Sequence, residues 1–448
     1  LSQIDGEPRT AQIDRPLDFA AVTDHAEWLG ETVLCTDPTS AAYDGALCNG
    51  ARTGDFAALR GAPRVGGRLV DVCGPDRSRC RAGLASGWEQ TVAAAERHYD
   101  RSSACSFTTF LGWEYTRAPE RSMTHRNIIL RNEIAPELPI SSIDASTPEA
   151  MWTKLKARCN DNGSGCEALS IPHNSNISNG RMFTVDWEAM DLQAQRKRAR
   201  MQREMEPLVE MMQAKGASEC RRGMWGVEGD DDPLCDFEQA RFIDGRPPPD
   251  CKDGTGSGAL RGEGCQSRLD FARYALVEGL AQEERLGVNP FQFGFIASTD
   301  GHNGAPGDTD EYAFQGHNSN DDSNRLRRLT TSSYVPHRLR NPGGLVGVWA
   351  EENSRDAIFD ALKRREVFGT SGTRIRVRFF GAWELPDLCA ANDPIEDAYA
   401  TGVPMGQTLP AASSKAPPMF FVSAVADPGT SQRAGPPLQR IQIVKGWH

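Results

Sequence analysis

The sequence lacks a long apolar run, because its strongest candidate, residues 291–297, is short and is soon followed by Asp300. A membrane-spanning helix needs about 20 consecutive apolar residues, so we expect no membrane span. An excess of positive charge is also missing: 61 acidic residues outnumber 50 basic ones, and the formal net charge is −11. We therefore expect no nucleic acid as the main partner, because nothing overall attracts the chain to phosphate backbones.

Several catalytic signatures are absent as well. The sequence contains no G-x-S-x-G serine-hydrolase motif and neither of the common glycine-rich phosphate-binding loops. It has no C-x-x-C pair, so zinc ribbons and thioredoxin-like redox sites lack support. Gly and Pro, at 43 and 28 of 448 residues, are too few for a low-complexity chain, which leaves a folded protein with a sizeable core.

The twelve cysteines fall mostly into close couples in polar loops. The couples are Cys35 with Cys48, Cys73 with Cys80, Cys159 with Cys166, Cys220 with Cys235, and Cys251 with Cys265, and Cys105 and Cys389 are left over. Such couples favour local disulfides, which predict an oxidising compartment. We expect a periplasmic or secreted protein, and a cysteine nucleophile is disfavoured because most thiols are occupied.

Apolar runs alternate with stretches of helical spacing along most of the chain. Strands are predicted at residues 17–23, 107–113, 127–130, 168–171, 208–212 and 293–298. Helices are predicted at residues 89–98, 148–158, 187–206, 268–285 and 354–364, with Thr147 as an N-cap and Met151 and Leu155 facing inward. This alternation predicts an α/β fold built on a parallel sheet or barrel.

Two regions depart from that pattern. Residues 221–266 show no periodicity and predict a disulfide-tied insertion, in which the acidic run at 228–233 lacks the residue order of a calcium loop. The tail predicts strands at 374–380, 419–425 and 441–445. We therefore divide the chain into a main domain at residues 1–370 and a small β-rich region at 371–448.

Four polar motifs follow apolar strands, and a fifth precedes one. The motifs are Thr23-Asp24-His25, Gly112-Trp113-Glu114, Ile171-Pro172-His173-Asn174, Ser298-Thr299-Asp300-Gly301-His302-Asn303 and, before its strand, Met123-Thr124-His125. The carboxyl ends of parallel barrel strands meet on one face, so these side chains are expected to converge. Imidazoles and carboxylates together suit a divalent metal that activates water. The remaining histidines, His98, His317, His337 and His448, are interpreted as surface residues.

Longer strings carry a family resemblance. They are residues 16–30, Gly112-Trp-Glu-Tyr-Thr116, His125-Arg-Asn127, Ile171-Pro-His-Asn-Ser-Asn176, Ser298-Thr-Asp-Gly-His-Asn-Gly304 and residues 344–352. They resemble the DUF3604 family, which is related to the PHP (polymerase and histidinol phosphatase) superfamily. The resemblance implies a distorted (β/α)7 barrel with up to three divalent metal ions, zinc, manganese or iron, and a metal-dependent hydrolase.

The resemblance also implies a ligand set. Glu114 would bridge two metals, Asp300 would bind the first, His125 and His173 the second, and His25 and His302 the third. An upstream strand with His-x-His, and a further His, would precede residue 1 in the family. Two ligands of the first site and one of the third are then missing, and only the second site is complete.

Neighbouring residues have two interpretations each. Glu114 and Asp24 are the candidate catalytic residues, although Asp24 can instead orient a ligand imidazole. Asn174 and Asn303 are candidate substrate-binding residues, and Asn174 can equally orient a ligand. Arg126 and Arg181 can clamp an anionic substrate or form structural salt bridges.

Three functions remain open. The first is a phosphoesterase-like hydrolase of a small anionic substrate. The second uses the same centre on a carboxylic ester, amide or sulfate, and the third is a non-enzymatic extracellular binding or structural protein. The oligomeric state has no signature in the sequence.

Overall fold

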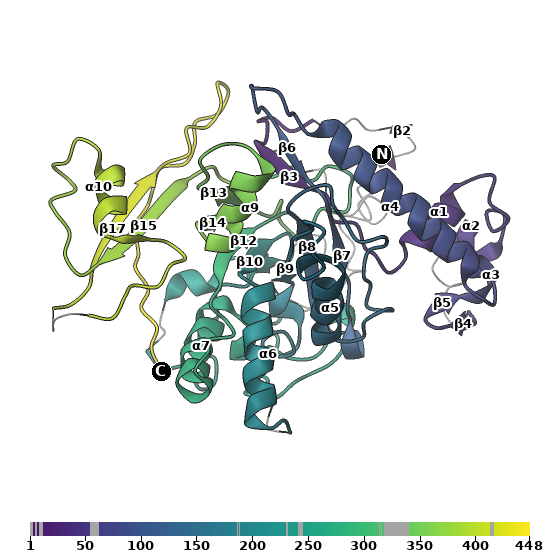
Figure 1. The fold of residues 1–448 in the computed structure, drawn as a ribbon, viewed down its shortest axis with the longest axis horizontal. Helices are drawn as coiled ribbons and strands as arrows, with labels where there is room; N and C mark the ends of the chain where they lie inside the picture. The colour runs from purple at the N-terminus through teal and green to yellow at the C-terminus, as the bar shows by residue number, and fades with distance from the viewer. Residues whose placement is uncertain are drawn as a thin grey trace.

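A computed structural model describes residues 3–4, 7–8, 12–53, 62–185, 187, 189–229, 232–240, 245–312, 314, 316–317, 340–412 and 416–448. Figure 1 shows a central body of strands and covering helices, with the long helix α4 (Ser78–His98) along one side. The C-terminal strands β15 (Arg376–Ala382) and β17 (Met419–Val425) lie at the opposite end, beside α10 (Pro394–Thr401).

The remaining elements follow the predicted alternation. The other helices are α1 (Leu29–Thr36), α2 (Ala46–Thr53), α3 (Val70–Cys73), α5 (Pro148–Leu155), α6 (Leu192–Met205), α7 (Ala272–Leu286) and α9 (Arg355–Arg364). The longer strands are β3 (Phe19–Ala21), β6 (Thr108–Phe110), β7 (Gly112–Tyr115), β8 (His125–Leu130), β9 (Ala168–His173), β10 (Leu208–Gln213), β12 (Gly294–Ala297), β13 (Leu345–Val348) and β14 (Val367–Thr370). Two-residue strands are β1 (Gln3–Ile4), β2 (Glu7–Pro8), β4 (Arg64–Val65), β5 (Arg68–Leu69), β11 (Gly216–Ala217) and β16 (Val403–Pro404).

Strand direction differs from the expected all-parallel arrangement at β8. Strand β3 runs parallel to β6, and β10 runs parallel to β12, as predicted. Strand β8 instead pairs antiparallel with both β7 and β9, because β7 and β8 are joined by a short connection on the same side of the sheet. Strands β7 and β9 therefore point the same way, while β8 begins at the edge where they end.

The core lies where helices cover both faces of these strands. Every residue of β9 is buried, including the polar residues Ser170 and His173, as is typical of a strand that is covered on both faces. Trp113 on β7 packs with Trp88 of α4 and Trp152 of α5 in one cluster. On the other side, Phe359 of α9 packs with Leu208 of β10. This packing fixes the strand ends against one another.

Most predicted elements are confirmed within a few residues. Thr147 caps α5, since its side chain accepts a hydrogen bond from the Ala150 backbone, and Met151 and Leu155 are fully buried. The prediction of a strand at residues 441–445 is wrong: no strand forms there, and Ile441 and Ile443 are more than half exposed. No sheet or helix among the described residues buries these alternating apolar side chains.

The structure is a mixed α/β protein with small sheets. Among the described residues the sheets do not close into a barrel, so the distorted (β/α)7 barrel stays a prediction, as do the two domain boundaries. No described helix combines the length and apolar character needed to cross a bilayer.

All five cysteine couples form disulfides, which confirms the predicted pairing of sequence neighbours. Cys105 and Cys389 carry free thiols. The insertion is irregular as expected. Its described residues contain two short 3-10 turns, Pro233–Asp236 and Ala259–Arg261, and an isolated bridge between Asp250 and Gln266, and two of the disulfides tie it.

Helix α4 begins eleven residues before the predicted start at Glu89. Its first half contains Gly83 and Gly87, and glycine is rarely found in helix interiors, so the sequence does not predict a helix there. These glycines let α1 approach closely. A Cβ at Gly83 would lie 2.7 Å from the Gly30 carbonyl oxygen and 3.3 Å from Leu34. The weak helix propensity of glycine is the cost of that contact.

Gly83→Ala is expected to lower the free energy of unfolding by about 1–2 kcal/mol. Alanine in an exposed helix would gain about 1 kcal/mol over glycine, but overpacking costs about 1–3 kcal/mol and wins here. Chemical denaturation measures the change, and exposed Ser86→Ala on the same helix is the control. A stabilised Gly83→Ala variant would contradict the close packing.

Candidate metal centre

The strand ends bring the predicted site residues to one edge. His25 follows β3 and forms a parallel bridge to Glu114 of β7. His173 ends β9, and it lies opposite His125, the first residue of β8. Because β8 runs antiparallel, its beginning rather than its end reaches this edge, which explains why His125 precedes its strand in the sequence.

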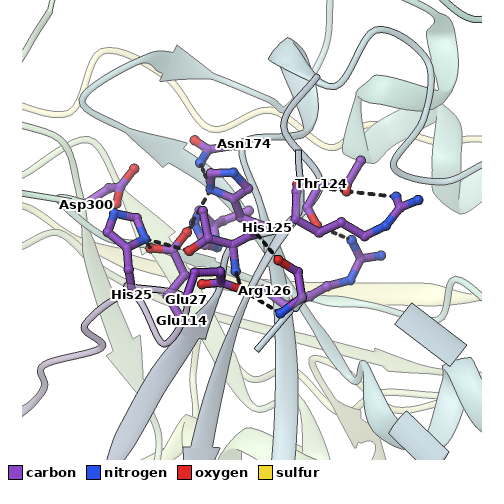
Figure 2. A network of polar contacts seen from close by, with 12 residues as sticks. His25, Glu27, Glu114, Thr124, His125, Arg126, Asn174 and Asp300 are labelled. Carbon is purple, nitrogen blue, oxygen red and sulfur yellow. Dashed lines mark hydrogen bonds and ion pairs between the residues drawn. The ribbon is translucent and has the colours of Figure 1, made fainter. Parts of the chain in front are cut away.

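Glu114 lies at the middle of the cluster (Figure 2). Its Oε1 atom is 2.7 Å from His125 Nδ1 and 3.4 Å from His173 Nε2, and its Oε2 atom is 3.0 Å from His25 Nδ1. Two ligand atoms bound to one ion at about 2.0–2.1 Å lie about 3 Å apart at a right angle and about 3.4 Å apart at the tetrahedral angle. The donor spacing around Oε1 therefore suits a shared cation.

Two other nitrogens of the cluster have no partner within the described part of the chain. Glu114 Oε1 is shared between His125 Nδ1 and His173 Nε2, whereas His125 Nε2 and His173 Nδ1 are buried without a hydrogen-bond partner among the described residues. Each such atom costs about 1–3 kcal/mol when unsatisfied. Donor atoms of Glu114, His125 and His173 all lie within 4.8 Å of one another, so these residues can hold a metal ion.

Burial and charge act together on the titration of this cluster. Burial alone would raise the pKa of the Glu114 carboxyl, but the imidazoles of His25 and His125 hold that pKa well below its usual range. Burial opposes the charged form of His173 and His25, yet Glu114 raises the pKa of each to about 9. Protons compete with cations for these nitrogens, so acidification is expected to weaken metal binding.

Residues around the cluster orient its ligands. His25 Nδ1 lies 2.5 Å from Thr116 Oγ1, and the buried Glu27 carboxylate accepts a hydrogen bond from the Thr116 backbone at 3.0 Å. Asn174 Nδ2 lies 3.4 Å from His125 Nδ1. These contacts fix the direction of the two imidazoles.

Asn174 and Asp300 both adopt left-handed backbone conformations directly after their strands, with φ of 65° and 50°. Asn and Asp are among the few non-glycine residues that tolerate this region. Gln213, at the end of β10, donates to both side chains, at 2.6 Å to Asn174 Oδ1 and at 2.8 Å to Asp300 Oδ2. This bridge ties β9, β10 and β12 together at the site.

Sequence reasoning missed the polar residues of β10 and of the turn after it. Glu210 and Gln213 of β10 and Lys215 in the turn are almost fully buried at this edge, where Ser298 donates to Glu210 and Lys215 donates to Ser218. Charged residues inside an otherwise apolar strand were the available signal, because such groups are rarely buried without a partner.

His317 was also missed, and its interpretation as a surface residue is wrong. Its side chain is buried, and its ring centroid lies 5.0 Å from that of His302. It follows β12 in an irregular segment, where no periodicity could reveal its position. Of the other three surface histidines, His98 and His448 are exposed, whereas His337 lies outside the described residues.

The candidate substrate residues have mainly structural contacts. Arg126 is buried and pairs with Glu206 at 2.8 Å, and Arg181 pairs with Glu120 at 2.7 Å, which favours the salt-bridge alternative for both. Asn303 donates to the Gly316 carbonyl at 2.6 Å. Asp24 is exposed, and its backbone carbonyl accepts from the Glu114 amide at 2.9 Å.

A further group of possible ligands, Glu31, Cys73 and Cys80, is not a metal site. The two cysteines form a disulfide with each other, so neither offers a thiolate. Glu31 pairs with Arg68 at 2.8 Å.

The loop after β9 is anchored by a buried carboxylate. Asp270 accepts hydrogen bonds from Ser178 Oγ at 2.6 Å and from the backbone amides of Gly180 and Ser267 at 2.9 Å. Burial raises its pKa from 3.8 to about 7, against the effect of these bonds. The folded protein therefore binds a proton at this residue where the unfolded chain has lost it.

Stability is expected to fall as the pH rises from 5 to 7, because ionised Asp270 is disfavoured only in the folded state. One proton bound in excess contributes up to about 1.4 kcal/mol per pH unit. Urea unfolding at both pH values measures this, and Asp270→Asn removes the titrating group. The same pH dependence in the variant would contradict the assignment.

Comparison with known proteins gives one match. A family model described as "Protein of unknown function (DUF3604)" matches residues 3–448. Neither the curated proteins nor the solved structures contain a match to this chain.

Proposed function

The chain belongs to the DUF3604 family, and from its cluster of imidazoles and carboxylates we propose that it is a metal-dependent hydrolase. The observation that carries the proposal is the buried Glu114 carboxylate with imidazole nitrogens of His125 and His173 at coordination spacing. A relation to the PHP superfamily, with its barrel and multinuclear centre, is part of the same proposal.

Each residue has a distinct role in this proposal. Glu114, His125 and His173 hold the ion, and Gln213 holds the Asp300 carboxylate in place. When bound, a divalent zinc, manganese or iron ion supplies a Lewis acid and a water molecule with a pKa near neutrality. The low pKa of Glu114 keeps its carboxylate charged and ready to bind a cation.

A small anionic phosphoester is the proposed substrate class. A cationic centre attracts such an ester and neutralises the charge that develops on its oxygens in the transition state. The five disulfides support a periplasmic or secreted location, because disulfides persist in oxidising compartments.

The test compares an aryl phosphate, an aryl sulfate and an aryl carboxylic ester with the full chain before chelation, after chelation and after metal is restored. We expect the phosphate to be hydrolysed, the activity to be lost with the metal, and zinc or manganese to restore it. Hydrolysis of only the sulfate or the ester would overturn the substrate class. No bound metal and no hydrolysis of any ester would overturn the enzyme and favour a binding protein.

A further inference from the structure

A second group of possible ligands lies on the other side of His25 from Glu114. It consists of Asp300, His302 and His317, whose donor atoms lie within 4.8 Å of one another. Asp300 and His317 are largely buried, whereas His302 is about one-third exposed, which leaves one open side. The family resemblance assigns no role to His317.

We propose that His317 is a ligand of a second divalent cation, which it binds together with Asp300, His302 and His25. This inference rests on the proposed metal-dependent function, and beyond what the family resemblance implies it adds His317 as a ligand. The Glu114 centre and this second site then lie side by side, joined through His25.

The backbone holds His317 in place for this role. The His302 amide donates to the His317 carbonyl at 2.7 Å, and Asn303 Nδ2 donates to the Gly316 carbonyl at 2.6 Å. Gly316 has a φ of 94°, which a residue with a side chain adopts only with strain. Two adjacent hydrogen bonds thus fix residues 316–317 against 302–303.

His25 is prepared to act as a ligand through Nε2. Its Nδ1 atom faces Glu114 Oε2 at 3.0 Å, so that nitrogen can carry the proton and donate it to the carboxylate. A carboxylate in this position orients a metal-binding imidazole and increases its basicity. The Nε2 atom lies 3.1 Å from His302 Nε2, a separation that suits two ligands of one ion.

The donor set favours a borderline ion. Three imidazoles and one carboxylate suit zinc or iron(II) better than magnesium or calcium, which prefer oxygen ligands. We therefore expect zinc or iron(II) at this site.

Elemental analysis of the full chain, after loading with zinc and removal of free ions, tests the inference. We expect two zinc ions per chain in the unmodified protein, one in His317→Ala and one in His173→Ala. His98→Ala, which changes an exposed histidine on α4, should keep two ions.

A cobalt-loaded His317→Cys variant provides a positive readout that does not depend on activity. A thiolate bound to cobalt(II) adds a charge-transfer absorption, which the unmodified protein should lack. Two zinc ions retained in His317→Ala, or a folded His317→Cys variant with cobalt bound and no such absorption, would overturn the inference. One zinc ion in the unmodified protein, lost in His173→Ala but not in His317→Ala, would overturn it and leave the proposed hydrolase centre standing. A protein that holds no divalent ion after loading with zinc, manganese or iron(II) in turn would overturn both.

Discussion

Glu114→Gln is expected to lose its bound metal and to lower hydrolytic turnover by more than about 100-fold. Glutamine keeps the size of the side chain but removes the charge that lies between His25, His125 and His173. Changes to outer partners of metal ligands already cost about 10- to 100-fold, so loss of a ligand should cost more. Metal content and aryl phosphate turnover measure the effect.

Glu137→Gln is the matched control, because Glu137 is highly exposed and pairs with the exposed Arg81 at 3.4 Å. It should keep both the metal and the turnover. The apo forms of Glu114→Gln and the unmodified protein should have similar secondary structure by circular dichroism, which separates loss of ligand from loss of fold. A Glu114→Gln variant that retains metal and turnover would remove Glu114 from the centre.

The sequence predicted those parts of the site that follow from strand position. His25, His173 and Asp300 each come directly after an apolar run, and parallel strands end at a common edge. The five disulfides could also be predicted, since each joins two cysteines that are 7 to 15 residues apart in the sequence. Local sequence patterns were therefore enough to predict both the edge at which the candidate ligands meet and the disulfides.

Long-range contacts account for the remainder. The direction of β8 depends on pairing with β7 and β9, which no local pattern records. His317 reaches the site through hydrogen bonds to residues 302–303, and its own segment has no periodic signal. The burial of His317 could therefore be predicted only from its contacts with residues 302–303, which the sequence does not show.

Arg126 shows the same limit, because sequence alone left it between a substrate clamp and a salt bridge. In the structure its Nε donates to Glu206 Oε1 at 2.8 Å and its Nη1 donates to the Thr124 carbonyl at 2.8 Å. Only 2% of its side chain and none of that of Glu206 is exposed. His125 and Arg126 are consecutive on β8, so they point to opposite faces, and only His125 faces the cluster.

Arg126→Met is therefore expected to lower the free energy of unfolding by about 3–5 kcal/mol, because it leaves the Glu206 carboxylate buried and unpaired. The double variant Arg126→Met with Glu206→Met should recover much of this loss, since both charges are then gone. Arg181→Met is the control, because its partner Glu120 is 63% exposed and such pairs contribute at most about 1 kcal/mol. Urea unfolding measures all three. An Arg126→Met variant of normal stability with a raised KM for the aryl phosphate would instead establish Arg126 as the substrate clamp.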